Sequence, residues 1–379
     1  MQLRLIKANE DILRQIEIVQ ELISKATTAR EMASYVGRIL EFCTALRTEA
    51  KRNIKDLDYG LEDTLIDILE NTQRIQSFFD LINTRLASPI IRNRPEDRIS
   101  LIVLQWLHDS HQDTSGLPFA VSDGSFAVYP TPDIPPVYLL PISRQQTLLT
   151  LPLFYHEFGH LLYICHKPEM DELIAEFQII VSDYFTPITV RNNRGMAKND
   201  FYRQRVVARW FDWTHEFFCD AVGLTIGGES YLKAFSHCFC THSRQHYYVP
   251  RERQLSSNHP VTWLRIKILL DLAKKYGLST LADEIEHAWK STANTYGIQE
   301  DYDGIWSEEF FIPLRKMLED MLTESQPITF SQFRSEDSNL IIQLNPVELL
   351  NLAWDKFEVD PNSYRSWEKS TIETYINAH

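Results

Sequence analysis

A long proline-free stretch at the start of this chain constrains the fold more than any other feature. Residues 1–88 contain no Pro and only two Gly. Apolar side chains recur there at helical spacing in three series: Ile12, Ile16, Val19 and Ile23; Val36, Ile39, Cys43 and Leu46; Leu65, Ile68, Ile75, Phe78 and Ile82. We expect three long helices, with a break near Ala26 and a capping box of Thr28 and Glu31 as the second helix begins at Arg30. They form either a bundle that covers the rest of the protein or an arm that binds a partner protein.

Residues 89–141 have a different composition, rich in proline and turn residues. Asp123 and Gly124 separate two short apolar runs in PFAVSDGSFAVYP, which predicts a β-hairpin. A further strand is expected at residues 137–140, after a Pro-Pro pair. We therefore expect the β-structure of the chain to lie within residues 115–141.

Helical patterns return after residue 147 and continue to the end of the chain. The expected helices are residues 150–166, 168–185, 199–226, 230–245, 260–276 and 279–296. The C-terminal extension is mainly helical, with possible strands at 329–333 and 340–344. These patterns predict a mainly α fold with a small β-sheet, of the α+β class. The three expected parts are residues 1–88, 89–300 and 301–379.

The charge balance and the cysteines restrict the partners and the compartment. Asp and Glu number 52 against 38 Lys and Arg, and the net charge of -14 repels phosphate backbones, so no nucleic acid partner is expected. The five cysteines are odd in number and lie mostly in apolar helical patterns, which is typical of reduced thiols in the cytoplasm. No export signal and no membrane-spanning stretch is visible. We therefore expect a soluble cytoplasmic protein.

The segment LPLFYHEFGHLLYICH carries the most specific chemical signal. His156 and His160 stand four residues apart, so on a helix they differ by about 40° in direction and about 6 Å in height. Both imidazoles can then bind one tetrahedral Zn²⁺ ion. Glu157 lies about 100° round the helix from His156, where it can hold a zinc-bound water as general base. The alternative is a pair of hydrogen-bonded core histidines, but in this apolar run such a buried polar face is costly without a metal.

A catalytic zinc ion needs a third protein ligand and an open fourth position. The first candidate is Glu216 in WFDWTHEFFCDAVG, with Asp220 four residues later to accept the second ring N–H of a zinc-bound His. Gly223, one turn further on, would let two helices approach closely. The competitor is His166, at the spacing of the third ligand in metzincins, but Tyr163 stands where those enzymes need a Gly to turn the chain back. Asp220 itself is a further alternative ligand.

His259 stands just before the helix expected at 260–276. A donor in this position can stabilise the oxyanion that forms as a carbonyl group becomes tetrahedral. Alternatively, neutral His259 fills the fourth zinc position and keeps the protein latent, or it only caps the helix. Tyr247 and Tyr248 are weaker donor candidates. Arg265 either orients this segment or lies on the helix surface.

Two other clusters of polar side chains resemble metal sites less closely. In residues 237–242, HCFCTH, the spacing of the two cysteines splays their sulfurs by about 200° on a helix, which argues against a second metal site. Residues 106–113, WLHDSHQD, are interpreted as the polar entry to a loop. Neither cluster is expected to bind a metal.

The pair of motifs HEFGH and EFFCD resembles the gluzincin metallopeptidases. The later segment NHPVTWLRI resembles the His-Pro segment, with a following Arg-Ile, of the HtpX and CaaX prenyl protease family. The resemblance covers about residues 150–270 and implies a zincin-like metallopeptidase core. It also implies that His156, His160 and Glu216 are zinc ligands and that Glu157 is the catalytic base. Those relatives are often membrane-embedded, so their substrate class does not transfer to this chain.

The expected function is a soluble endopeptidase with one catalytic Zn²⁺ ion, acting on a protein or peptide, and either latent or dedicated to one substrate. A peptide must lie extended to reach the metal, and a sheet edge formed by residues 119–129 or 137–140 can bind it as an added strand. The rival hypothesis is a zincin-fold sensor or binding protein whose metal is not catalytic. Its function would be partner recognition, for example through the N-terminal helices.

Overall fold

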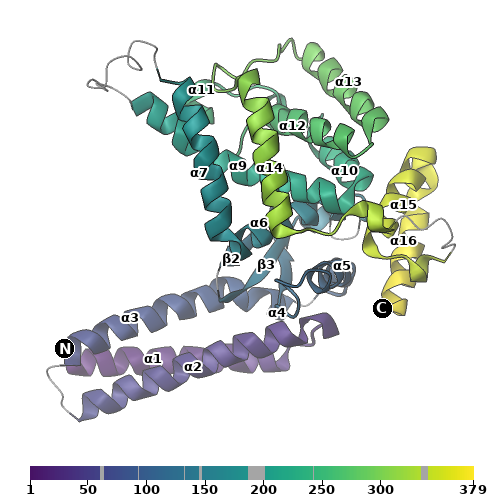
Figure 1. Ribbon diagram of the computed structural model, residues 1–379. Helices are drawn as coiled ribbons and strands as arrows, with labels where there is room; N and C mark the ends of the chain where they lie inside the picture. Colours follow the sequence, from purple (N-terminus) through teal and green to yellow (C-terminus); the bar gives the residue numbers. More distant parts are fainter. Residues whose placement is uncertain are drawn as a thin grey trace. The chain divides into compact units, whose positions relative to one another are not determined.

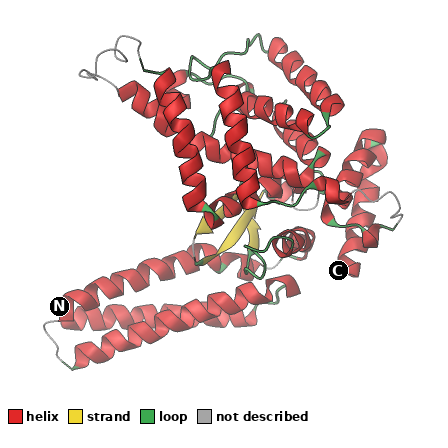
Figure 2. Ribbon diagram, in the orientation of Figure 1, coloured by secondary structure: helices red, strands yellow, loops and turns green. Residues whose placement is uncertain are grey.

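The computed structural model describes residues 1–59, 64–92, 94–131, 133–144, 147–186, 201–241, 243–333 and 340–379. They form two compact units, one of residues 1–105 and 116–146 and the other of residues 106–115 and 147–379. Both units are mainly helical, and the first contains a small mixed sheet, as the sequence predicts (Figures 1 and 2). The expected division at 88/89 and 300/301 differs from these two units and stays a prediction.

The three long helices predicted at the start of the chain are present in the first unit. They are α1 (Gln2–Lys25), α2 (Ala33–Asp58) and α3 (Leu65–Leu81), and each packs against the other two (Figure 1). The buried face of α1 follows its predicted apolar series, with Ile12 and Ile16 enclosed. On α2 and α3 the prediction is shifted at two positions, since Tyr35 and Phe79 are buried while Val36 and Phe78 are half-buried.

The link between the first two helices differs from the prediction. A short 3₁₀ turn, Arg30–Met32, precedes α2, and its N-cap is Ala29 without a side-chain hydrogen bond. The capping box of Thr28 and Glu31 is therefore wrong. Glu31 instead pairs with Arg98 at 3.4 Å, because its carboxylate is largely enclosed beside that guanidinium.

The sheet of the first unit has a strand order that the sequence does not reveal. Its strands are β1 (Ala120–Asp123), β2 (Ala127–Thr131) and β3 (Ile134–Leu140), in the order β1-β3-β2. β1 runs parallel to β3, and β2 runs antiparallel to it. The predicted hairpin across Asp123 and Gly124 is wrong, because the strands on either side of that pair both bond to β3 and not to each other.

The central position of β3 also decides which residues can form a sheet edge. Residues 137–140 lie between two strands, with β1 paired on one side and β2 on the other. They therefore cannot bind a peptide as an added strand. Pro135 and Pro136 lie inside β3, not before it, but outside its pairing with β1, where a missing N–H costs little. Only β1 and β2 present edges in this sheet.

The second unit is built from helices around α9 (Phe201–Gly227). Its other helices are α6 (Phe154–Cys165), α7 (Lys167–Tyr184), α10 (Glu229–Phe239), α11 (Arg251–Gln254), α12 (Thr262–Lys275), α13 (Ser279–Thr295), α14 (Phe311–Ser325), α15 (Pro346–Val359) and α16 (Pro361–Ala378). Helices α6, α7, α10, α12, α14 and α15 all contact α9, whose C-terminal half is buried on every side. α5 (Arg98–Asp109) runs from the first unit into the second.

The six helices predicted between residues 147 and 300 are present, with shifted ends. The helix expected at 260–276 begins at Thr262, with Val261 as its N-cap, and ends before Gly277, whose positive φ of 81° suits a residue without a side chain. The strands predicted at 329–333 and 340–344 are wrong. Both segments form 3₁₀ turns, and within the described residues β-structure is confined to the sheet of the first unit.

No helix among the described residues is long and apolar enough to cross a membrane.

Candidate metal centre

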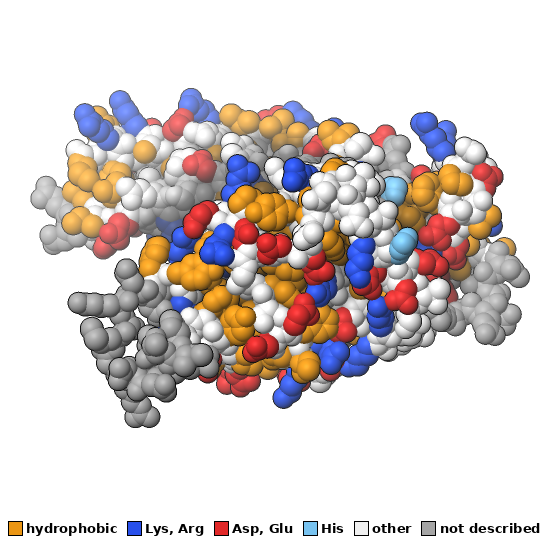
Figure 3. Space-filling view, turned by 90° about the horizontal axis from the view of Figure 1, so that it is seen from above, with side chains coloured by type: hydrophobic (Ala, Val, Ile, Leu, Met, Phe, Trp, Pro, Cys, Tyr) orange, Lys and Arg blue, Asp and Glu red, His pale blue; other side chains and the backbone are white. Residues whose placement is uncertain are grey.

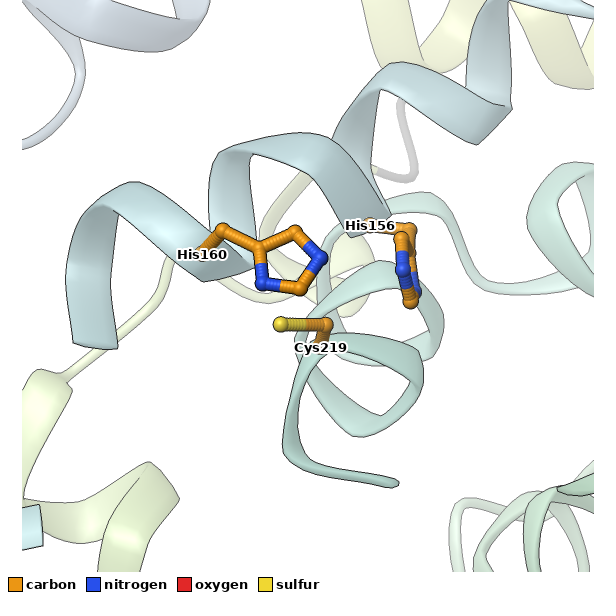
Figure 4. Close-up of side chains that lie close together, drawn as sticks. All are labelled: His156, His160 and Cys219. Carbon is orange, nitrogen blue, oxygen red and sulfur yellow. The ribbon is translucent and has the colours of Figure 1, made fainter. Parts of the chain in front are cut away.

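The candidate centre lies where α6 and α9 approach closely. Gly159 of α6 faces Cys219 of α9, and a Cβ atom added at Gly159 would lie 2.8 Å from Cys219 Cα. This is closer than side chains tolerate, so the contact requires glycine. Figure 4 shows that the approach places His156 and His160 of α6 beside Cys219. It also brings the two histidines to the turn of α9 that carries Glu216.

Glu216 faces both histidines of the HEFGH motif. Its Oε2 atom lies 3.5 Å from His156 Nε2, and its Oε1 atom lies 3.7 Å from His160 Nε2. Both separations exceed the usual N–H···O distance of about 2.9 Å. They match the edge of a tetrahedron whose centre is about 2.1 Å from each donor atom, which is about 3.4 Å. Each of the two separations, made through different oxygens of Glu216, is therefore compatible with two ligands on one metal ion.

The charge of this cluster also suits a cation. Glu216 Oε2 is buried and accepts no hydrogen bond from the described residues, although Arg265 Nη1 lies 3.3 Å from it. Asp220, buried beside Glu216, shares the same guanidinium. Two enclosed carboxylates face one guanidinium, so a second positive charge, either a proton on His156 or a metal ion, is needed to offset the remaining negative charge. Two imidazoles and a carboxylate form a donor set typical of zinc.

Asp220 occupies the position behind His156 that the sequence predicts. Its Oδ1 atom accepts hydrogen bonds from His156 Nδ1 at 2.9 Å, Tyr231 Oη at 2.8 Å and Arg265 Nη2 at 2.7 Å. Arg265 Nε donates to the second oxygen at 2.7 Å. Since a carboxylate can only accept, His156 carries a proton on Nδ1, and its Nε2 atom is directed toward Glu216.

The two histidines experience opposite electrostatic effects. Burial alone lowers the pKa of His156, but its hydrogen bond to Asp220 and the nearby carboxylate of Glu216 outweigh burial and raise the pKa to about 10. Burial, reinforced by the charge of His156, lowers the pKa of His160 to about 3. Burial raises the pKa of Glu216, but His156 and Arg265 outweigh it and hold the pKa well below its usual range. His160 is therefore neutral, and a metal ion at His156 would take the place of a proton.

His259 lies beside the same carboxylate. Its Nε2 atom is 3.4 Å from Glu216 Oε1, and its side chain is 64 % exposed. The N-cap of α12 is Val261, and no side chain caps this helix. The interpretation of His259 as a mere helix cap is therefore wrong. Two roles stay open for His259, that of oxyanion donor and that of fourth zinc ligand, because its exposed ring lies beside Glu216.

Glu157, the predicted base, is buried on α6 directly after His156. The other predicted candidates are engaged elsewhere. His166 Nε2 lies 3.0 Å from Asp113 Oδ2, so it belongs to an ion pair at the far end of α6. Tyr247 donates to the carbonyl oxygen of Cys240 at 2.6 Å.

Sequence reasoning leaves the role of Arg265 open and misses Tyr231. Arg265 is buried between Asp220 and the ring of Phe235, so the surface interpretation of this arginine is wrong. Tyr231 is fully buried, and a Cβ atom at Gly223 would lie 2.5 Å from its ring. Gly223 thus makes room for a tyrosine of α10. A glycine one turn after a buried carboxylate is the signal that points to such a partner.

The histidines of residues 106–113 have structural contacts. The rings of His108 and His111 pack against Phe158, with centroids 5.4 and 4.7 Å away. His111 Nδ1 donates to the carbonyl oxygen of Leu107 at 2.8 Å, and His111 Nε2 accepts from the backbone of Ile328 at 3.2 Å. The first residues of this segment belong to α5 and not to a loop.

The remaining cysteine cluster, residues 237–242, lies partly outside the described residues because it includes His242. In the described part of the chain, one set of three metal-binding groups has all its ligand atoms within 4.8 Å: His156, His160 and Cys219.

Comparisons of this chain with protein-family models, with curated proteins and with solved structures find no match.

The contact of Gly159 with α9 predicts a large effect of a small substitution. Gly159→Ala should destabilise the protein by about 1–3 kcal/mol, because the added methyl group meets the backbone of Cys219. Chemical denaturation measures the change. Gly37→Ala on α2 is the control, since nothing lies within 4 Å of its new methyl group, and it should stabilise by about 0.5–1 kcal/mol. Equal stability of the Gly159→Ala variant and the wild type would contradict the close packing.

Proposed function

We propose that this chain is a zinc-dependent endopeptidase with a zincin-like core, in which His156, His160 and Glu216 hold one Zn²⁺ ion. The observation that carries the proposal is the position of Glu216. Its two oxygens lie 3.5 and 3.7 Å from the Nε2 atoms of the two histidines, which suits a shared metal better than direct hydrogen bonds. The HEFGH motif supports the catalytic interpretation, since a structural zinc ion has no use for Glu157.

A bound zinc ion supplies a Lewis acid that polarises a scissile carbonyl group and acidifies water. The chain supplies the proton transfers. Glu157 accepts the proton of the attacking water and delivers it to the leaving amine, so that the amine departs uncharged. Burial of Glu157 restricts competing contacts of its carboxylate with bulk water.

The residues behind the ligands keep them in position. Asp220 holds the proton of His156 on Nδ1, so its Nε2 atom stays available to the metal. Arg265 and Tyr231 in turn fix Asp220 through three hydrogen bonds of 2.7–2.8 Å. Arg265 also faces Glu216 and neutralises part of its charge, which moderates the basicity of this carboxylate.

His259 is the proposed oxyanion donor. Its exposed ring lies on the solvent side of Glu216, where a substrate carbonyl would approach. A neutral imidazole N–H or an imidazolium there donates to an oxygen that gains negative charge in the transition state. The same position also allows His259 to obstruct the centre, and the two roles predict opposite effects of its removal.

The substrate, the partner and the compartment stay predictions from the sequence. A protein or peptide substrate follows from the proposed chemistry, and a cytoplasmic location follows from the cysteine pattern. Ala120, Val121 and Ser122 of β1 are buried, so the outer edge of β2 remains the candidate for strand addition.

Glu157→Gln should reduce peptide cleavage by about 10²–10⁴-fold, because the amide cannot accept a proton. Zinc content should stay at one ion per chain, since Glu157 is not a proposed ligand. Cleavage of a denatured protein mixture, with and without chelator, and metal analysis of the same preparation measure both quantities. Undiminished chelator-sensitive cleavage would contradict the proposed base. If the wild type binds zinc but cleaves nothing, the rival hypothesis of a non-catalytic metal gains support.

Glu216→Ala should weaken zinc binding by at least about 100-fold, because only two protein ligands remain. Competition with a chromophoric chelator measures the affinity. Glu284→Ala is a matched control, since Glu284 is exposed on α13 of the same unit and should leave zinc binding unchanged. Zinc binding of wild-type strength in the Glu216→Ala variant would show that another group is the third ligand.

His259→Ala should lower kcat by about 10²–10³-fold while zinc content and KM change little, as expected for a group that acts mainly in the transition state. His287→Ala removes an exposed histidine of α13 and serves as the control. An increase in activity of the His259→Ala variant would contradict the donor role and would identify His259 as a group that blocks the centre.

A further inference from the structure

Cys219 is a buried thiol at the candidate centre that the proposed mechanism does not use. It lies on α9, three residues after Glu216, and its side chain is completely enclosed. Its Sγ atom and one ring nitrogen each of His156 and His160 all lie within 4.8 Å of one another. Figure 4 shows the sulfur next to the His160 ring, on the side of the histidines that faces α9. The thiol of Cys219 and the carboxylate of Glu216 therefore lie near the same two imidazoles.

The position of this thiol is fixed by backbone packing. Gly159 lies between the two histidines in the chain, and a Cβ atom there would be 3.3 Å from Cys219 Sγ and 2.8 Å from its Cα. Any bulkier residue at 159 would separate the helices and move the sulfur away from the imidazoles. The thiol is thus held at the centre by the same contact that positions the ligands of the proposed zinc site.

Cys219 is a free thiol, so a cation that binds its sulfur displaces the thiol proton. The metal–sulfur bond forms as the S–H bond breaks, the proton leaves to solvent, and no group is oxidised or reduced.

The two donor sets differ in chemical softness. The set with Glu216 has separations of 3.5 and 3.7 Å and a hard oxygen donor, which suits zinc. The ligand atoms of the set with Cys219 all lie within 4.8 Å of one another, and its thiol favours a soft ion.

We propose that Cys219, with His156 and His160, forms a second donor set that captures a thiophilic cation, represented by Cd²⁺, in place of the zinc ion held through Glu216. This inference rests on the proposed metal centre. Because both sets use the same two histidines, the two ions exclude each other. A thiophilic cation would therefore displace zinc and stop the proposed peptidase.

Titration of the purified full-length protein with Zn²⁺ and with Cd²⁺ tests the proposal. The readouts are the thiolate-to-cadmium charge-transfer absorption and competition between the two metals. In the wild type, Cd²⁺ should displace zinc and produce the absorption. Cys219→Ala should lose this absorption, and its preference for cadmium over zinc should fall by about 10-fold or more. Glu216→Ala should show the reverse pattern, with weak zinc binding and retained cadmium absorption.

Cys43→Ala is the matched control. Cys43 is as buried as Cys219 but lies on α2 of the first unit, so its removal should leave the cadmium absorption unchanged. Cys165 is exposed, and a Cys165→Ser background removes its contribution from every sample. The cadmium NMR shift of the wild type moves downfield with a thiolate ligand, so it reports sulfur binding even if Cys219→Ala fails to fold.

Cadmium absorption that persists at full strength in the Cys219→Ala variant would overturn the proposal. A wild-type cadmium NMR shift typical of nitrogen and oxygen ligands alone would also overturn it. Both results leave zinc binding through Glu216 intact. A different result, folded wild-type protein without stoichiometric zinc, would contradict the proposed metal centre itself.

Discussion

The Asp220 carboxylate is the interaction on which the candidate centre depends. It is buried on α9 and accepts hydrogen bonds from three other helices, through His156 of α6, Tyr231 of α10 and Arg265 of α12. An unpaired carboxylate in such a place would be very costly. With these partners, one charge joins four helices and sets the orientation of the first histidine of the HEFGH motif. The position of His156 is thus a property of the whole helical core and not of α6 alone.

Close packing supplies the second constraint. Gly159 lets α6 approach α9, and Gly223 gives space to the Tyr231 ring. Glycine in a helix interior costs about 0.5–1 kcal/mol relative to alanine. The chain therefore gives up intrinsic helix stability to bring the side chains of the centre together. The residues gathered by this packing combine two imidazoles with the carboxylates of Glu216 and Asp220 and one guanidinium, so an added cation would offset the remaining negative charge.

The sequence predicts the centre better than it predicts the sheet, for a physical reason. HEFGH and EFFCD are local patterns, and helical geometry alone places His156 beside His160 and Glu216 on the same helix as Asp220. The strand order β1-β3-β2 depends on pairing between residues far apart in the chain, and the Asp123-Gly124 turn signal does not specify it. Strand 137–140 appears from its sequence as a possible edge, but its two neighbours are visible only in the fold.

Arg265 and Tyr231 show why the prediction of the centre is incomplete. An arginine in an amphipathic helix has no sequence signal for burial, and its location becomes clear only from the carboxylates of Glu216 and Asp220 that surround it. Cys219 is likewise an ordinary buried cysteine until α6 is placed against it. Arg265 and Tyr231 lie outside both motifs, and three-dimensional packing alone connects all three residues with the histidines.

A crystal structure of the zinc-loaded protein with data collected on both sides of the zinc absorption edge tests the central claim most directly. The account predicts one anomalous peak, about 2.1 Å from the Nε2 atoms of His156 and His160 and from a carboxylate oxygen of Glu216. A peak elsewhere in well-folded protein, or no peak while Glu216 pairs with Arg265 alone, would contradict it.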